Sequence, residues 1–170
     1  MKLLLVRHAH AGWSPDENRP LSAAGLQEAQ KLADTLSLHA IGAVYSSPLR
    51  RALQTVQPVA QRLGLDVVIE PDFRERVLGD FSGLSFEEAV RRTWSDFHFA
   101  FPGGESNAAA QDRAVRAVQS LAVRAPAAQV VVGTHGNLLA LILNHYDSAI
   151  GYDFWRQLKM PDVVELDVSA

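Results

Sequence analysis

Arginine or histidine side chains follow three separate apolar segments of this 170-residue chain. Arg7 and His8 form the first group, Arg50 and Arg51 the second, and His135 belongs to the third. The net charge of the whole chain is −3, so these local concentrations of positive charge need a reason. Guanidinium groups match phosphate oxygens in both geometry and charge. The residue types therefore indicate a site for a phosphate ester.

A histidine in such a site can act as a nucleophile. The neutral imidazole of His8 can attack phosphorus in line and form a phosphohistidine. Arg7, Arg51 and a protonated His135 would neutralise charge on the equatorial phosphate oxygens. A carboxyl group must protonate the leaving oxygen and later activate water. Glu75, in the glycine-containing loop segment 73–83, is the best candidate, and a solvated ion pair with its flanking arginines is the alternative explanation of that residue.

These side chains can act together only if the fold places them at one edge. Short, apolar, β-branched segments predict five strands, at residues 3–6, 43–45, 67–69, 129–132 and 163–166. Their continuous apolar character predicts burial on both faces. Helical spacing and capping residues predict helices over residues 22–37, from the N-cap Ser47 to Gly64, after the capping box at residues 85–88, from Ser106 to near Pro126, and over residues 136–144.

Strands that alternate with helices predict an α/β fold with a mostly parallel sheet. Ligands of such sheets bind beyond the carboxyl ends of the strands. The residues that follow positions 6, 45 and 132 are therefore expected to form the site. The length predicts one domain over residues 1–170.

The composition argues against several other classes of protein. The chain has no cysteine, which removes thiol catalysis and cysteine metal sites. A net charge of −3 argues against a nucleic-acid partner. The apolar run at residues 3–6 is too short for a signal peptide or a membrane span. We therefore expect no membrane association and a cytoplasmic location.

The motifs, taken in chain order, resemble those of the histidine phosphatase superfamily, also called phosphoglycerate mutase-like. The matching segments are residues 5–8 with Trp13, residues 20–29, residues 46–55, residues 74–76 with Gly79 and Gly83, residues 102–106, and residues 133–137. Each motif alone is weak, but their common order makes the resemblance specific.

The resemblance implies a set of roles. His8 would be the phosphorylated nucleophile, and Glu75 the general acid and then base. The expected ligands of the phosphoryl group are Arg7, Arg51 and His135, together with Ser14 and Gly136. No metal or organic cofactor is implied. The implied fold is a three-layer α/β/α sandwich with one antiparallel strand, and we expect a small lid-like insertion around residues 73–106.

Three positions depart from the family pattern. Ala9 replaces the usual glycine, His10 the usual glutamate or glutamine, and Ser14 a frequent asparagine. We expect these changes to affect the substrate specificity more than the type of reaction. A small-molecule phosphate ester is the expected partner, and a homodimer is left open.

Several alternatives stay open at this point. A phosphatase is favoured over a phosphoglycerate mutase-type transferase because residues 160–170 contain no cation. A non-catalytic phosphate-binding module is a second alternative. A metal-dependent hydrolase is a third, with ligands drawn from His8, His10, Asp80 and His135. The aromatic residues between positions 94 and 101 either form an apolar lid over the substrate or pack a small subdomain; they are Trp94, Phe97, Phe99 and Phe101.

Overall fold

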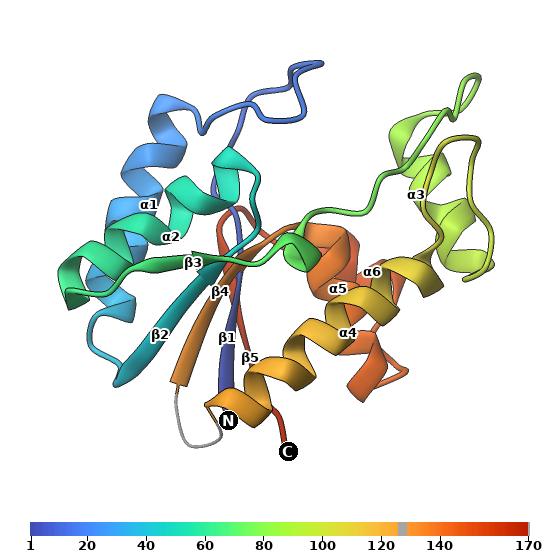
Figure 1. Cartoon of the computed structure of the whole chain (residues 1–170). Helices are drawn as coiled ribbons and strands as arrows, with labels where there is room; N and C mark the ends of the chain where they lie inside the picture. Colours follow the sequence, from blue (N-terminus) through green and yellow to red (C-terminus); the bar gives the residue numbers. More distant parts are fainter. Residues whose placement is uncertain (126–128, 170) are drawn as a thin grey trace.

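The centre of the molecule is a five-stranded sheet, seen in a computed structural model that describes residues 1–125 and 129–169 (Figure 1). Its strands are β1 (Lys2–Arg7), β2 (Ile41–Ser46), β3 (Val67–Ile69), β4 (Gln129–Thr134) and β5 (Asp162–Asp167). The spatial order is β3-β2-β4-β1-β5. Neighbouring strands are parallel except β5, which runs antiparallel to β1. The predicted sheet is confirmed.

Helices cover both faces of this sheet (Figure 1). One face carries α1 (Ala23–Leu36) and α2 (Arg50–Leu63), and the other carries α4 (Asn107–Arg124) and α5 (Gly136–Tyr146). The remaining helices are α3 (Phe86–Ser95), α6 (Tyr152–Gln157) and the short 3-10 turn η1 (Pro71–Phe73). The three-layer α/β/α sandwich expected from the sequence is confirmed.

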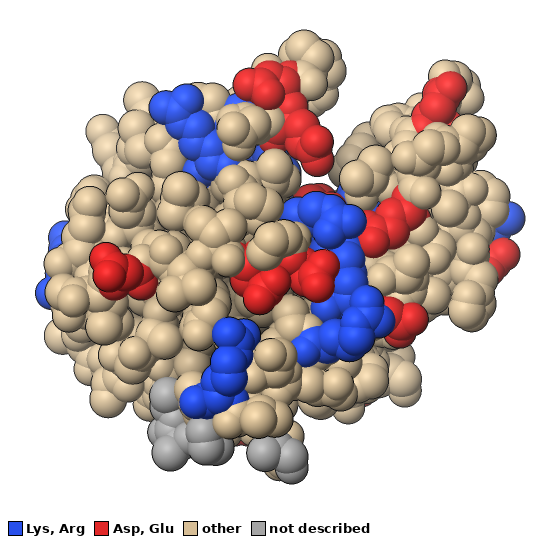
Figure 2. Space-filling view, in the orientation of Figure 1, with Lys and Arg blue, Asp and Glu red and all other residues tan. Residues whose placement is uncertain are grey.

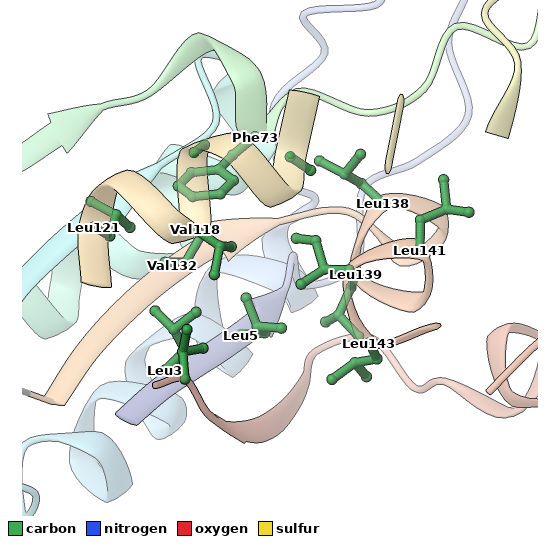
Figure 3. Close-up of a cluster of buried hydrophobic side chains, with 14 of the residues drawn as sticks. Leu3, Leu5, Phe73, Val118, Leu121, Val132, Leu138, Leu139, Leu141 and Leu143 are labelled. Atoms are coloured by element: carbon green, nitrogen blue, oxygen red, sulfur yellow. The ribbon is translucent and has the colours of Figure 1, made fainter. Parts of the chain in front are cut away.

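Strand β1 lies between two apolar cores, one on each face of the sheet. Leu3 and Leu5 face α4 and α5, where Phe73 also packs (Figure 3). Leu4 and Val6 face α1 and α2. Because successive side chains of a strand point to opposite faces, a strand that is buried on both sides must be apolar at every position. This explains the uninterrupted apolar run before Arg7.

The two outermost strands do not follow that expectation. Val68 and Ile69 of β3 are 47% and 44% exposed. Glu165 and Asp167 of β5 are also exposed. An edge strand has only one neighbouring strand and is incompletely covered by helices. The residue pattern of a strand does not show whether the strand lies at the edge or in the middle of the sheet. The prediction of burial on both faces is therefore wrong for β3 and β5.

Side-chain caps begin three of the helices as expected. Ser22 accepts from the Gly25 amide at the start of α1, Ser106 caps α4, and Ser85 forms a complete capping box with Glu88 at the start of α3. Helix α2 ends at Gly64, which adopts φ +65°. Glycine tolerates this left-handed conformation best.

Helix α2 begins later than predicted. Its first residue is Arg50, and its N-cap is Leu49 rather than Ser47. Helix α4 ends at Arg124, and the predicted stop at Pro126 lies outside the described residues. None of the helices in the described part of the chain combines the length and the hydropathy that a membrane crossing requires.

Candidate active site

Three neighbouring strands end at the same edge of the sheet and carry the predicted side chains there. The His8 amide donates to the Thr134 carbonyl at 3.0 Å, and the Ser47 amide donates to the Gly133 carbonyl at 2.8 Å. These bonds continue the strand pairing one residue beyond β1 and β2. The loops after β1, β2 and β4 therefore meet around a pocket of about 650 Å³.

His8 lies in this pocket with only 8% of its surface exposed. Its Nδ1 is 2.7 Å from the Ala9 carbonyl, so Nδ1 carries the ring proton and donates it. Nε2 then keeps its lone pair and accepts from Arg51 Nε at 3.2 Å. Burial, together with the positive charges of Arg51 and Arg7, lowers the pKa of His8 to about 4. At neutral pH the ring is uncharged and Nε2 is unprotonated.

Four arginines surround the pocket: Arg7, Arg19, Arg51 and Arg76. Burial lowers the pKa of Arg7, Arg51 and Arg76 from the ordinary arginine value. Within the described residues, Nε of Arg7, Arg19 and Arg76 is buried and has no hydrogen-bond partner. Buried donors without partners are rare in folded proteins and indicate a missing ligand. An anion fits this set of donors.

Two of these arginines bond to backbone carbonyls that hold them in place. Arg7 Nη1 donates to the Leu158 carbonyl at 2.6 Å, and Arg51 Nη1 donates to the Glu17 carbonyl at 2.7 Å. Gly136 makes room for the first of them, because a Cβ at that position would lie 2.9 Å from Arg7 Nε. Gly136 therefore lines the pocket as predicted, and a side chain at this position would collide with the Arg7 guanidinium.

His135 is fully buried at the end of β4, and its ring lies edge-on to His8 with centroids 5.3 Å apart. Burial and the charge of Arg51 lower its pKa well below the usual histidine value. The ring is therefore neutral in the ligand-free site, contrary to the expectation of a protonated His135. Desolvation of a buried imidazole outweighs the benefit of a charge that has no anion beside it.

Ser47 holds the ring of His135 through a hydrogen bond. Ser47 Oγ accepts from the Leu49 amide at 3.2 Å and lies 2.8 Å from His135 Nε2. The hydroxyl can bond to Leu49 and to His135 at once, because it has one donor and two acceptor lone pairs. The residue expected to cap α2 thus orients a site histidine.

Glu75 reaches the same pocket and lies against the first turn of α5. Its carboxylate accepts from the Arg76, Asn137 and Leu138 amides at 2.9, 3.1 and 3.0 Å. The first amides of a helix have no partner inside the helix and attract negative charge. The alternative of a solvated ion pair does not describe this residue, because the amides of α5 fix it at the pocket wall.

The loop that carries Glu75 is held by Arg113 of α4, a buried residue that the sequence analysis missed. Arg113 donates to the Asp72 and Arg74 carbonyls at 2.6 and 3.0 Å. It also forms a two-pronged ion pair with Glu105 at 2.8 and 2.9 Å. Glu105 belongs to the motif at residues 102–106. This motif therefore helps to hold the Glu75 loop, through the ion pair between Glu105 and Arg113.

The other predicted positions lie outside the phosphate-sized part of the pocket. Ser14 does not line it, because its Oγ accepts from the Asp16 amide at 3.1 Å in an exposed turn. The methyl group of Ala9 is buried with Leu21 and Ala29, so it does not crowd a ligand. The short Ser14 side chain is occupied by its own turn, and Arg19 lines the pocket instead.

The aromatic residues between positions 94 and 101 do not line the pocket. Trp94 and Phe97 pack against the core that contains α4 and α5. Trp94 Nε1 also donates to Asn137 Oδ1 at 3.0 Å. Of the two interpretations left open, packing is right for these residues. Other rings line the pocket: Trp13, Phe81, Phe86 and Trp155.

The ligand set proposed for a metal-dependent hydrolase is not assembled. His10 is turned away, with Nδ1 2.8 Å from Ser22 Oγ at the start of α1. The Asp80 carboxylate accepts from the Ser82 amide in an exposed loop. Across residues 1–125 and 129–169, no group of three histidine, aspartate or glutamate side chains is placed to hold a metal ion.

Comparison with known proteins agrees with this geometry. The profile of the histidine phosphatase superfamily (branch 1) matches residues 3–168. The Arabidopsis thaliana phosphoglycerate mutase-like protein 4 is 34% identical over 156 residues, which cover 81% of this chain and 67% of that protein. Phosphoserine phosphatase 1 of Hydrogenobacter thermophilus is 32% identical over 149 residues, covering 79% and 71%.

A solved structure shows the same architecture. A mycobacterial glucosyl-3-phosphoglycerate phosphatase in complex with inorganic phosphate superimposes with a TM-score of 0.78 and 26% identity. The superposition covers 98% of this chain and 89% of that one.

Proposed function

The chain belongs to the histidine phosphatase superfamily, and from this premise we propose that it hydrolyses phosphomonoesters of small metabolites through a phosphohistidine on His8. One observation carries the proposal. His8 Nε2 is unprotonated, and its lone pair accepts from Arg51 Nε in a pocket lined by four guanidinium groups and a single carboxyl side chain; the lone pair becomes free for phosphorus when Arg51 turns to a phosphate oxygen. A nucleophile without a proton and a surplus of cations are what attack on a phosphate dianion requires.

In the first step, Nε2 of His8 forms a bond to phosphorus as the bond from phosphorus to the ester oxygen breaks. Arg7 and Arg51 stabilise the charge on the equatorial oxygens. His135 lies beside His8, with ring centroids 5.3 Å apart, and we assign to its imidazole a further contact with the phosphoryl oxygens. We assign to Glu75 the proton that the departing alkoxide takes up.

In the second step, Glu75 takes a proton from a water molecule as the water oxygen bonds to phosphorus. The bond from phosphorus to Nε2 then breaks, inorganic phosphate leaves, and His8 returns to its starting form. The amides of α5 hold the Glu75 side chain at the pocket wall; in this scheme it is protonated before the first step and a carboxylate only between the two steps. Arg113 is a positioning residue for this loop.

Hydrolysis is favoured over phosphoryl transfer to a second hydroxyl of the substrate. A mutase must keep water away from its phosphohistidine, whereas the wall of this pocket reaches solvent at Phe86, which is 60% exposed. The relatives named phosphoserine phosphatase and glucosyl-3-phosphoglycerate phosphatase also favour hydrolysis. A cytoplasmic location and the absence of a nucleic-acid partner belong to this proposal; they rest on the short apolar run at residues 3–6 and on the net charge of −3.

Release of inorganic phosphate from p-nitrophenyl phosphate tests the function. We expect turnover by the wild-type protein, loss of turnover in His8→Ala, and wild-type rates in His98→Ala, whose exposed ring lies outside the pocket. The wild-type rate is also expected to survive dialysis against EDTA. Equal rates in wild type and His8→Ala would overturn the proposed nucleophile, and loss of activity with EDTA that zinc or magnesium restores would favour a metal-dependent hydrolase.

A further inference from the structure

Large aromatic side chains stand around the mouth of the pocket and remain in contact with water. We define the aromatic rim as Trp13, Phe81, Phe86 and Trp155, all of which line the pocket. Trp13 is 88% exposed and Phe86 is 60% exposed. Exposed apolar patches next to a binding pocket mark places where a ligand is bound. A ligand group that covers these rings would be bound favourably, because it removes apolar surface from water.

Three of these rings form a connected surface. Phe81 and Phe86 meet edge to face with centroids 6.4 Å apart, and Phe86 lies 6.1 Å from Trp155. Phe101 supports Phe81 from outside the pocket at 6.3 Å. The rings come from the loop before α3, from the first residue of α3 and from α6. Segments far apart in the chain thus build one apolar wall.

The charges near the pocket are divided between its floor and its rim. Three of the four guanidinium groups lie close enough to His8 to act on its charge: Arg7, Arg19 and Arg51. The loops that carry Trp13 and Phe81 also carry exposed acids: Asp16, Glu17 and Asp80. In the space-filling view the molecule is hollowed between the loop after β1 and the part around α3, and acidic side chains lie on both sides of the hollow (Figure 2). The floor therefore suits a phosphoryl group. At the rim the acids disfavour a second anionic group, and the rings suit an apolar one.

We propose that the preferred substrates are phosphomonoesters of alcohols that carry a flat apolar or aromatic group, which stacks within the aromatic rim while the phosphoryl group faces His8. This assignment rests on the proposed phosphatase function and names the substrate class. Aromatic rings prefer edge-to-face or offset contacts, each of which adds specificity beyond the area that it covers. Small polar esters such as phosphoserine leave the rim uncovered.

A matched pair of substrates tests the assignment, because it separates the rim from the chemistry. 2-Phenylethyl phosphate and ethyl phosphate are both esters of primary alcohols, so their leaving groups differ in the ring far more than in basicity. We expect kcat/KM, measured by phosphate release, to be at least about 10-fold higher for the phenylethyl ester than for the ethyl ester, from one or two ring contacts. O-phosphoserine should resemble ethyl phosphate.

Variants of the rim locate the preference. Phe86→Ala and Trp13→Ala are each expected to reduce the ratio of the two kcat/KM values about 2- to 10-fold, the worth of one ring contact. Both side chains are exposed, so their loss leaves the core intact. Leu38→Ala is the matched control, since Leu38 is an 85% exposed apolar residue outside the pocket, and it should keep the wild-type ratio.

The outcomes separate this inference from the proposed function. Equal kcat/KM values for the two esters, or a ratio that both rim variants leave unchanged, would overturn the aromatic-rim assignment while phosphatase activity stands. A higher kcat/KM for phosphoserine than for the phenylethyl ester would also overturn it. No phosphate release from any of the three esters would instead contradict the proposed function.

Discussion

Acidification changes the fraction of His8 that is neutral, and the environment of the ring determines the pH at which this happens. His8 has a pKa of about 4 because the ring is buried and because Arg51 and Arg7 face it. An ordinary histidine titrates near about 6.5. At pH 5 the His8 ring is therefore about nine-tenths neutral, whereas an ordinary histidine would be about 3% neutral. The fraction of protein ready to attack phosphorus differs about 30-fold between the two cases.

The same shift changes the free energy of unfolding. The unfolded chain takes up a proton on His8 near pH 6.5, but the folded chain resists this until about pH 4. Between these values the unfolded state binds more protons, so acid favours unfolding. The contribution is fully present above about pH 6.5, and about 3 kcal/mol is lost by pH 4. His8→Gln removes this part of the pH dependence.

Nitrogen-15 NMR of the ligand-free protein measures the ionisation directly. The His8 signal, assigned by its absence in His8→Gln, should show a neutral ring with the proton on Nδ1 at pH 7 and should titrate near pH 4. Urea unfolding at pH 7 and pH 5 supplies the stability difference between wild type and His8→Gln. A midpoint near 6.5, or a proton on Nε2 at pH 7, would refute the account of the nucleophile.

Three further substitutions have defined outcomes. Glu75→Gln should slow esters of high-pKa alcohols far more than p-nitrophenyl phosphate, because nitrophenolate leaves without a proton; equal losses in kcat would remove the acid role. Ser47→Ala should lower kcat about 10-fold, the worth of one hydrogen bond to His135, and broaden or shift the His135 NMR signals; an unchanged spectrum would contradict the hydrogen bond between Ser47 and His135. Gly136→Ala should push a Cβ against the Arg7 guanidinium and raise KM and the inhibition constant of inorganic phosphate together about 10-fold, since one charged contact is weakened; unchanged constants would show that Arg7 does not hold phosphate.

The fold was largely predictable because its signals are local. Each of the five strands was predicted from a short β-branched run, and Ser22, Ser85 and Ser106 were recognisable as caps from their own neighbours. The convergence of Arg7, His8 and Arg51 on the pocket, with His135 buried against His8, follows from the rule that parallel strands end at one edge. The edge position of β3 was not predictable, because sheet order depends on contacts distant in sequence.

Other features of the site depend on where the fold turns a side chain. Ser47 has the sequence signal of a helix cap, but its hydroxyl is used by His135. Arg113 resembles any arginine on a helix, and only the packing of α4 brings it under the Glu75 loop. The aromatic residues nearest the motif at positions 102–106 were considered for a lid, yet Trp94 faces the core and Phe86 faces the pocket.

Isolation of the phosphorylated protein tests the central claim most directly. The protein is mixed with p-nitrophenyl phosphate labelled in its phosphoryl group, quenched in alkali after milliseconds, and mapped by mass spectrometry under conditions that preserve phosphohistidine. The account predicts one phosphoryl group on His8, attached at Nε2, and a larger amount of it in Glu75→Gln, where release by water is slowed. A phosphoryl group on another residue, or turnover without any phosphorylated protein, would contradict the claim.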